Sequence, residues 1–459
     1  MTPVSPRSRG GRQFAAVALV AISTICVHPV VADAQQGGEG FERWATAHAV
    51  PIQSVEPGNG AADLRRLKPI IGAARVVSLG EPAHGVHESL ALRNRLFRYL
   101  VEELGFTAIA IESGFPESRR IFDFVSGGPG AAGQVVRENL TWGFGAFQEN
   151  EELVRWIREY NADATHRRKV RFYGIDLSLG GPGGSTPTPA ALDAALSYLA
   201  RVDSTSAQRM RATFRRYLGS LSGGAASLSR VEHDGASAAI DDLIALLERE
   251  RPAFIAASSE ADYEWAYRNA IVARQADRVF RVNPPEAPGG GIPPTAWQAV
   301  TARDAAMAEN VRWVLAQEGP EGRVLVFAHN MHVKNARTEG GIWSVFERPP
   351  NAMGQYLRSA LGDDLLIIGM SSAQKAAGLP ATPAESGSVD ATLARVGPPR
   401  FLLDLRASRD DRAASAWFAE RRELRANSTT CVTLSPGAAF DAIVYVDSLS
   451  SARTAPPAR

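Results

Sequence analysis

The sequence has only two cysteines in 459 residues, and one of them lies near the N-terminus. Cys26 falls in a segment that we expect to be removed, which leaves Cys431 as the single thiol of the mature chain. A chain with one cysteine forms no intrachain disulfide, and it offers no cysteine-based metal site. Disulfide-stabilised folds and zinc-finger-like modules are therefore excluded.

The chain also lacks a hydrophobic run long enough to cross a membrane, which takes about 20 residues. The run at residues 14–26 has thirteen residues and follows three arginines. Ala32-Asp33-Ala34 then supplies an A-x-A cleavage site before Gln35. A positive start, a short apolar run and a small-residue site, in this order, are typical of a secretory signal peptide. We expect residues 1–34 to be removed and the mature protein to be secreted or periplasmic.

The chain also has almost no excess of charge of either sign, with 50 Lys and Arg against 49 Asp and Glu residues. The full chain carries a formal net charge of +1, and loss of residues 1–34 removes three arginines and one aspartate, which leaves about −1. A nearly neutral chain gives no sign of nucleic-acid binding or of a basic membrane-binding surface. We expect a small-molecule partner, no nucleic acid, and no membrane once the signal is removed. The sequence does not indicate an oligomeric state.

What the chain does have is a series of short, almost continuous apolar runs, a pattern typical of strands covered on both faces. Helical patterns separate them, at residues 90–104, 149–161 and 301–317 among others. Repetition of strand, helix and strand predicts an α/β fold with a mostly parallel central sheet flanked by helices. The expected strands are residues 75–79, 107–111, 170–175, 324–328, 365–368, 401–405 and 442–446.

The pattern changes in the middle of the chain, where long helical stretches follow one another without a convincing strand. We therefore expect a large helical insertion or cap at residues 179–298, bounded by loops rich in glycine and proline. Residues 35–178 and 299–450 would then form the two parts of the α/β core. Residues 451–459 (SARTAPPAR) have the composition of a disordered tail.

Polar residues follow four of the expected strands, and in an open parallel sheet ligands bind beyond the carboxyl ends of the strands. Each residue alone has an ordinary explanation, such as a charge near a helix N-terminus, a turn cap or a core histidine. Together they indicate a functional site, because a buried cluster of acids and imidazoles is costly without a purpose. The residues are Glu81, His84 and His87 after the first strand, Glu112 after the second, Asp176 after the third, and His329 and His332 after the fourth.

The order of these motifs resembles the erythromycin esterase family. Gly80-Glu81-x-x-His84, Arg93, Glu112 and His329-Asn330-x-His332 carry the resemblance, which runs from about residue 41 to 449. Supporting stretches are Tyr173 to Leu177, Met307 to Asn310, Met353 to Leu357, Gly362 to Asp364 and Gly387 to Val389.

The resemblance implies hydrolysis of an ester by water, and the best-known members of the family open the lactone ring of macrolide antibiotics and so give resistance. It carries active-site positions over to Glu81, His84, Arg93, Glu112, His329 and His332. His87 departs from the family pattern, and we expect it, with Asp176, to contact substrate. The secretion signal also differs from the cytoplasmic resistance members, which leaves the substrate open.

The residues themselves are consistent with that chemistry, since an imidazole near its ordinary pKa is a good base for water. We expect His84 to be the base, with Glu81 or Glu112 fixing its tautomer. Glu81 is favoured because it lies three positions away in the same loop. Arg93 and the two later histidines are candidates for stabilising the oxyanion or protonating the leaving group.

Three other readings stay open. Two His-x-x-His pairs with Glu81 and Glu112 offer ligands for zinc or manganese, although known members of the resembled family mostly work without metal and we expect no cofactor. The segment Gly369 to Ala373 faintly resembles a serine nucleophile elbow. The third interpretation is a non-catalytic module on the same fold, which binds a small molecule or acts in the envelope. The sequence does not reveal the substrate. We expect the helical region to line the substrate pocket.

Overall fold

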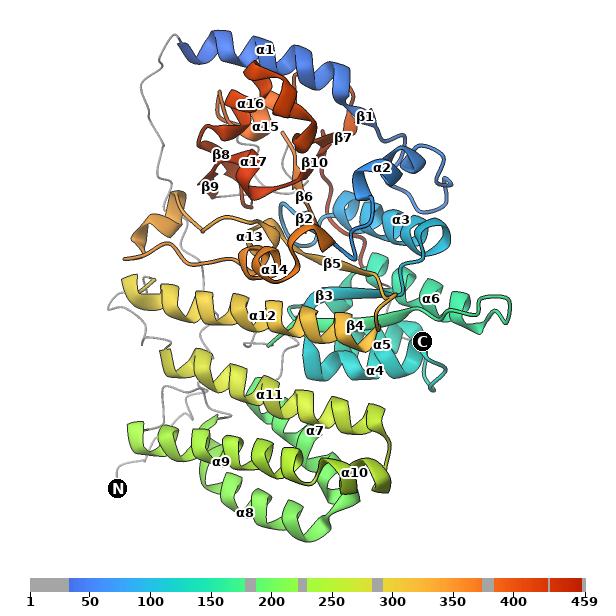
Figure 1. Ribbon diagram of the computed structural model, residues 1–459, viewed down its shortest axis with the longest axis vertical. Helices are drawn as coiled ribbons and strands as arrows, with labels where there is room; N and C mark the ends of the chain where they lie inside the picture. Colours follow the sequence, from blue (N-terminus) through green and yellow to red (C-terminus); the bar gives the residue numbers. More distant parts are fainter. Residues whose placement is uncertain are drawn as a thin grey trace, which may run out of the picture.

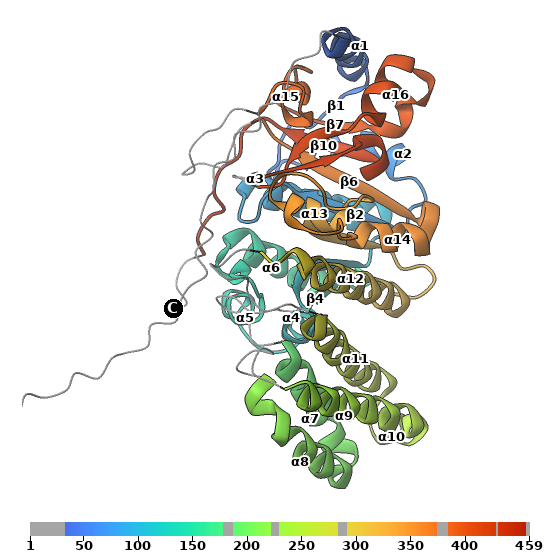
Figure 2. The same cartoon turned by 90° about the vertical axis from the view of Figure 1, so that its left-hand side faces the viewer.

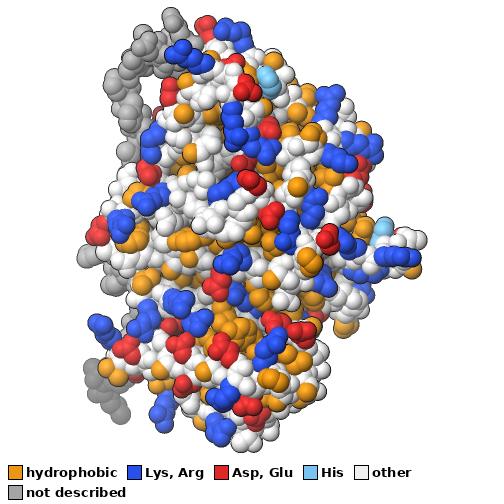
Figure 3. All heavy atoms as spheres, in the orientation of Figure 1, with side chains coloured by type: hydrophobic (Ala, Val, Ile, Leu, Met, Phe, Trp, Pro, Cys, Tyr) orange, Lys and Arg blue, Asp and Glu red, His pale blue; other side chains and the backbone are white. Residues whose placement is uncertain are grey.

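The computed structural model describes residues 33–177, 187–221, 229–282, 292–373, 384–427 and 430–455. The expected signal peptide, residues 1–34, lies outside these ranges except for its last two residues, which begin helix α1 (Asp33–His48). None of the helices in the described ranges is both long and apolar enough to span a bilayer. Figure 3 shows basic and acidic side chains mixed over one face of the molecule.

Within the described residues, a central sheet has eight strands in the order β1-β7-β10-β6-β2-β5-β3-β4. The six strands from β10 to β4 are parallel, whereas β7 runs antiparallel to β10 and β1 antiparallel to β7. All seven expected strands are in this sheet, so the expected α/β fold with a mostly parallel sheet is confirmed. The strands are β1 (Val50–Pro51), β2 (Val76–Glu81), β3 (Ala108–Gly114), β4 (Arg171–Asp176), β5 (Val324–His329), β6 (Leu365–Ser371), β7 (Arg400–Asp404) and β10 (Ala442–Val446).

The continuous apolar strands are explained by two cores, one on each face of the sheet. Along β5, Val324 and Val326 enter one core, and Leu325 and Phe327 enter the other. Each fully buried side chain of this kind contributes about 1.5–3 kcal/mol, so a sheet covered on both faces favours apolar residues at most positions. The first core also contains residues of α12 (Trp297–Gln317), α14 (Met353–Leu361) and α16 (Arg412–Ala419), and the second contains residues of α3 (His87–Leu104), α5 (Ala132–Asn139) and α6 (Gln148–Ala162).

The middle of the chain is helical, and its helices form the lower part of the molecule in Figures 1 and 2. Arg268, on the last of them, donates to Asn310 Oδ1 at 3.0 Å and to Glu309 Oε1 at 2.9 Å, both on α12. Asn310 in turn donates to the carbonyl of Ile175 at the end of β4. The helical layer is thus tied to the sheet beside the carboxyl ends of the strands. Its members are α7 (Pro187–Val202), α8 (Ser204–Leu221), α9 (Arg230–Arg249), α10 (Arg251–Ala257) and α11 (Glu260–Val282).

The end of the chain differs from expectation. We expected a disordered tail from residue 451, but residues 451–455 are described and form β-bridges from Ser451 to Val86 and from Thr454 to Phe147. Their backbone groups are hydrogen-bonded to two loops. These hydrogen bonds order the segment, although its polar composition is typical of disorder. Residues 456–459 lie outside the described residues.

Short elements complete the molecule. A two-stranded hairpin stands apart from the main sheet and adds a small β-layer near α15. The remaining helices and strands are α2 (Lys68–Ile71), α4 (Phe115–Val125), α13 (Asn330–Val333), α15 (Val389–Leu393), α17 (Pro436–Ala439), β8 (Arg422–Arg425) and β9 (Cys431–Leu434), with 3-10 helices η1 (Leu64–Leu67), η2 (Phe144–Ala146), η4 (Pro294–Ala296), η5 (Gly341–Val345), η6 (Gly362–Asp364) and η7 (Leu405–Asp410).

Candidate active site

Four neighbouring strands carry the candidate site residues to one edge of the sheet. In spatial order these are β2, β5, β3 and β4, and they deliver Glu81, His329, Glu112 and Asp176. Glu81 and His329 are direct neighbours in the parallel register. The sequence order of the strands differs from this spatial order, so residues up to 248 positions apart meet only because the sheet is assembled in this way.

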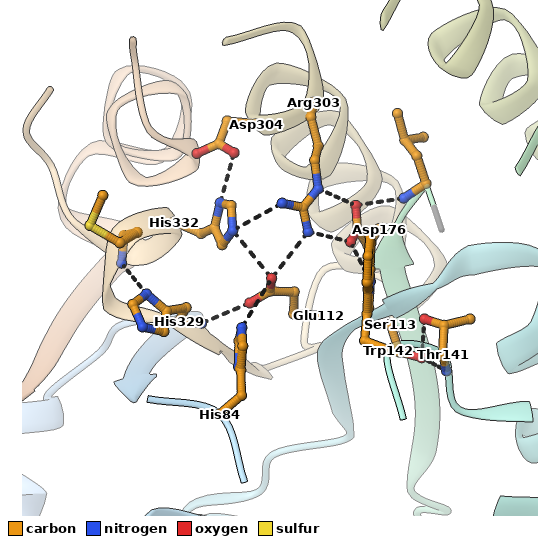
Figure 4. Close-up of polar contacts among 12 residues, drawn as sticks. His84, Glu112, Ser113, Thr141, Trp142, Asp176, Arg303, Asp304, His329 and His332 are labelled. Atoms are coloured by element: carbon orange, nitrogen blue, oxygen red, sulfur yellow. Dashed lines mark hydrogen bonds and ion pairs between the residues drawn. The ribbon is translucent and has the colours of Figure 1, made fainter. Parts of the chain in front are cut away.

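His84 is the most accessible of the candidate residues. It lies in the loop after β2, where its Nδ1 is 2.7 Å from Glu81 Oε1, and its side chain remains 41% exposed. Its Nε2 faces Glu112 Oε1 at 3.9 Å (Figure 4). Burial works to lower the pKa of His84, but the charge of Glu112 and the hydrogen bond and charge of Glu81 outweigh it, so the pKa is raised. One ring nitrogen is therefore fixed by a carboxylate, and the other lies beyond hydrogen-bond distance of Glu112.

Glu112 connects the other groups of the site. One oxygen, Oε2, accepts the backbone N–H of His329 at 2.8 Å. The other, Oε1, is 3.1 Å from Arg303 Nη2 and 3.2 Å from His332 Nε2. Burial would raise the pKa of this carboxyl, but the charges of His332 and His84 hold it well below its usual value. Glu112 is thus a buried anion shared among several cations.

The two later histidines differ in charge, since the His329 ring is neutral and the His332 ring is a cation. Burial and the nearby charge of His84 lower the pKa of His329 to about 3, so its ring is neutral. Its Nδ1 accepts the backbone N–H of Met331, and its Nε2 donates to the carbonyl of Pro82. Burial would lower the pKa of His332 too, but Asp304 and Glu112 raise it to about 10. His332 is therefore an imidazolium at neutral pH, donating to Asp304 Oδ1 at 2.7 Å.

Arg303 was missed by the sequence reasoning, and it lies at the centre of the site. It donates from Nε to Asp176 Oδ1 at 3.0 Å and from Nη2 to Asp176 Oδ2 at 2.5 Å, in addition to its contact with Glu112. The ring of Trp142 lies beneath the guanidinium at 5.4 Å and donates its Nε1 proton to Asp176 Oδ2. Among the described non-glycine residues only Trp142 has a positive φ, of 61°. Backbone strain of this kind is typical of functional sites.

Asp176, His87 and Arg93 have surroundings that the sequence did not predict. Asp176 is fully buried and accepts from Arg303, Trp142 and the backbone N–H of Leu177, so it positions Arg303. His87 lies apart, with Nδ1 2.7 Å from Glu149 and Nε2 2.8 Å from Glu56. Both side chains are engaged by protein partners, and the expected contact of Asp176 and His87 with substrate stays a prediction.

Arg93 differs in a similar way. Its side chain is 1% exposed, donates to Asn94 Oδ1, and lies over the ring of Phe327 at 4.8 Å. Burial lowers its pKa to about 10, although the charge of Glu81 opposes the shift. Arg93 lines a small cavity together with Glu81 and Glu112, with about 10 Å³ for a water molecule. The charge of Arg93 favours the ionised form of Glu81, and the expected catalytic role of Arg93 stays a prediction.

The sequence does contain a signal for Arg303 and Asp304. Both lie one helical turn before Met307 and Ala308, which belong to the buried face of α12. Residues four positions apart share one face of a helix, so these two charges interrupt an apolar stripe. Buried charges at such positions indicate partners elsewhere in the fold.

Two alternative chemistries have little geometric support. Across the described ranges, no three His, Cys, Asp or Glu residues have an arrangement that would hold a metal ion. His87, which was to complete the first His-x-x-His pair, is engaged by two glutamates. The serine of the elbow-like segment, Ser371, is buried and donates to Asp390 Oδ1 at 2.6 Å, so it pairs with a carboxylate where a triad would place a histidine.

Comparisons with known proteins agree with the fold and with the expected family. The family model described as "Erythromycin esterase" matches residues 101–449. Erythromycin esterase type II of Escherichia coli is 29% identical over 345 residues, 72% of this chain and 77% of that protein. A Bacillus cereus protein of known structure is 25% identical, with a TM-score of 0.75 over 91% of this chain and 99% of that one. An erythromycin esterase mutant in its open conformation gives a TM-score of 0.67 at 19% identity, over 88% and 98%.

Proposed function

The chain belongs to the erythromycin esterase family, and from this premise we propose that it is an exported esterase or lactonase that hydrolyses its substrate with water activated by His84. The observation that carries the mechanism is the His84–Glu81 pair. The imidazole is held from behind at 2.7 Å while its side chain stays 41% exposed, as a base that must meet substrate requires.

In the proposed reaction, a water molecule near His84 Nε2 attacks the ester carbonyl carbon. The new C–O bond forms as the water proton moves to Nε2, and the carbonyl becomes an oxyanion. Glu81 stabilises the imidazolium that results and keeps Nδ1 as the donor, the division of roles that general-base catalysis needs. The same Nε2 proton then goes to the departing alkoxide, which gives a carboxylic acid and an alcohol.

The positive groups beside Glu112 supply the electrostatic support. Arg303 and the imidazolium of His332 are fixed by Asp176 and Asp304 before any substrate arrives. Charges that are already oriented cost no reorganisation when the oxyanion forms, which is why such arrangements are effective in a site shielded from water. Glu112 holds both cations in place, so its role differs from that of Glu81.

For the substrate, we propose an ester or macrolide-type lactone. Support comes from the names of two relatives, the erythromycin esterases of types I and II from Escherichia coli, which are 33% and 29% identical over 111 and 345 residues. The experiment is to incubate the purified protein with macrolides, simple lactones and aryl esters. Hydrolysis is read by mass spectrometry as the gain of one water.

The His84→Ala variant is the matched control for that screen. Loss of a general base lowers kcat by about two to four orders of magnitude. The melting temperature should hardly change, because the His84 side chain is partly exposed. His48→Ala, on α1 and exposed, should keep full activity. Turnover of His84→Ala within a few-fold of the unmodified protein would show that another group is the base.

A further inference from the structure

The segment after the last sheet strand crosses the loop that carries His84. In Figure 2 it is the red trace that descends from the sheet at the left of the molecule. We name residues 450–455 the C-terminal strap. His87 donates its backbone N–H to the carbonyl of Ser450 at 2.9 Å, and Ala452 donates to the carbonyl of Gly85 at 2.8 Å. The strap therefore pairs with residues directly after His84.

The same strap also pairs with a second loop, around η2. Gln148 donates its backbone N–H to the carbonyl of Arg453 at 2.8 Å. Ala455 donates to the carbonyl of Ala146, also at 2.8 Å. The strap thus joins two loops that are about 60 residues apart in the sequence.

Side chains fix the strap at both of its ends. Ser450 donates from its backbone and from its hydroxyl to Glu88, each at 2.7 Å. Arg453 donates to Glu149 Oε1 at 2.9 Å and to Glu152 Oε2 at 2.8 Å. Glu149 Oε1 is the same atom that pairs with His87, so Arg453 and His87 share one buried carboxylate. This accounts for His87, which the active site does not use.

The two loops meet against the proposed base. The ring of Phe144, in η2, lies 5.1 Å from the ring of His84. A Cβ atom at Gly85 would come within 3.0 Å of the Phe147 ring, and Gly85 has φ +70°, so the loop is closely fitted on this side. Asn150 holds the carbonyl of Phe144 from α6. The position of His84 thus depends on contacts that the strap reinforces from outside.

We propose that the C-terminal strap is a positioning element that holds the His84 loop against the Phe144 loop and so sets the orientation of the base. This role rests on the proposed function, since His84 is the group that it positions. The strap follows the segment matched by the family model, which ends at residue 449, so the inference comes from this chain's own contacts. A displacement of about 1 Å at a reacting group can reduce the rate about 100-fold, which is why such support matters.

The test compares truncation after Leu449 with truncation after Ala455, which keeps the strap and serves as the control. Removal of the strap should lower kcat about 10- to 100-fold while KM changes little, because binding groups elsewhere are unaffected. Hydrogen exchange should accelerate at residues 82–87 and 144–148 and stay unchanged in α9. The pKa of His84, followed by NMR of the imidazole, should fall toward its ordinary value as the contact with Glu81 loosens.

Arg453→Ala keeps the test decisive if the truncated chain does not fold. This variant should show smaller changes in kcat, in hydrogen exchange and in the pKa of His84 than the truncated chain. Arg453→Lys should restore part of kcat. The surface control Arg395→Ala, which loses a pair with Glu42, should show none of these changes. Unchanged exchange in the two loops, or accelerated exchange with unchanged kcat, would overturn the proposal. A full-length protein that hydrolyses nothing would defeat the proposed function alone, because the exchange and NMR measurements need no turnover.

Discussion

His332 donates its Nδ1 proton to Asp304 at 2.7 Å, and this contact keeps a positive charge beside Glu112. The pKa of His332 is raised to about 10, while that of His329, three residues earlier, is lowered to about 3. The two histidines of the His329-Asn330-x-His332 motif therefore have different roles. One is a fixed cation, and the other is a neutral ring that shapes the loop.

The raised pKa of His332 gives a prediction for stability. A group whose pKa is higher in the folded state binds its proton more tightly there, so its contribution is complete below the unfolded value of about 6.5 and disappears as pH rises through about 10. The contribution of His332 to the free energy of unfolding should therefore decrease between pH 7 and pH 10. Urea denaturation at several pH values measures this, and His332→Gln should reduce the slope. Equal slopes in the two proteins would contradict the assigned charge.

A second prediction concerns Arg303, which neutralises Asp176 and Glu112 at once. Arg303→Ala leaves both carboxylates buried without this partner, and breaking a buried ion pair from one side costs about 3–5 kcal/mol. Asp176→Ala alone leaves the arginine with Glu112, and the double variant should be less destabilised than the sum of the single variants. Denaturant unfolding of the three variants gives the coupling energy. Additive effects would mean that Arg303 and Asp176 do not act as a pair.

How far the sequence leads depends on whether a feature is local. Strands such as β5 were predictable because residues covered on both faces must be apolar at each position, and Glu112 and His329 were found because they directly follow strands. Arg303 could not be placed in this way. Its role depends on where α12 crosses the edge of the sheet. That position is set by tertiary packing, which short sequence motifs do not specify.

The surroundings of His87 and Arg93 were unpredictable for a related reason. His87 lies three positions after His84, but a helix begins at that residue and turns its side chain toward Glu56 and Glu149. Arg93 lies on the same helix and is buried against the ring of Phe327. Short motifs specify which residues are present, whereas the direction of each side chain is set by the element that follows. The tail was misjudged because its order comes from partners more than 300 residues away.

A third prediction concerns export. The three arginines, the apolar run and the A-x-A site predict cleavage after Ala34, so protein recovered from the periplasm or medium should begin at Gln35. N-terminal sequencing of the exported protein checks this. Replacing Ala32 and Ala34 with bulky residues should block processing, and expression without residues 1–34 should give folded protein in the cytoplasm. An exported chain that still begins at Met1 would refute the assignment.

The last prediction separates the roles of Glu81 and Glu112. Both carboxylates favour the protonated form of His84, so the base is neutral only above a raised pKa, and kcat/KM should fall as pH falls through a value above 6.5. Either Glu→Gln change removes one of these charges and should move that limb to lower pH.

The two variants should differ in rate and in stability. Glu81→Gln keeps the shape of the pair but loses the charge that stabilises the imidazolium, so kcat should drop strongly with little change in KM. Because burial raises the pKa of Glu81, its replacement by a neutral residue should cost little stability. Glu112→Gln instead leaves Arg303 and His332 without their shared anion, so the melting temperature should fall as well. Steady-state kinetics across pH, with calorimetry on the same samples, gives both readouts. Near-normal kcat in Glu81→Gln beside an inactive but stable Glu112→Gln would reverse the two roles, and full activity in both would make the Glu and His cluster structural.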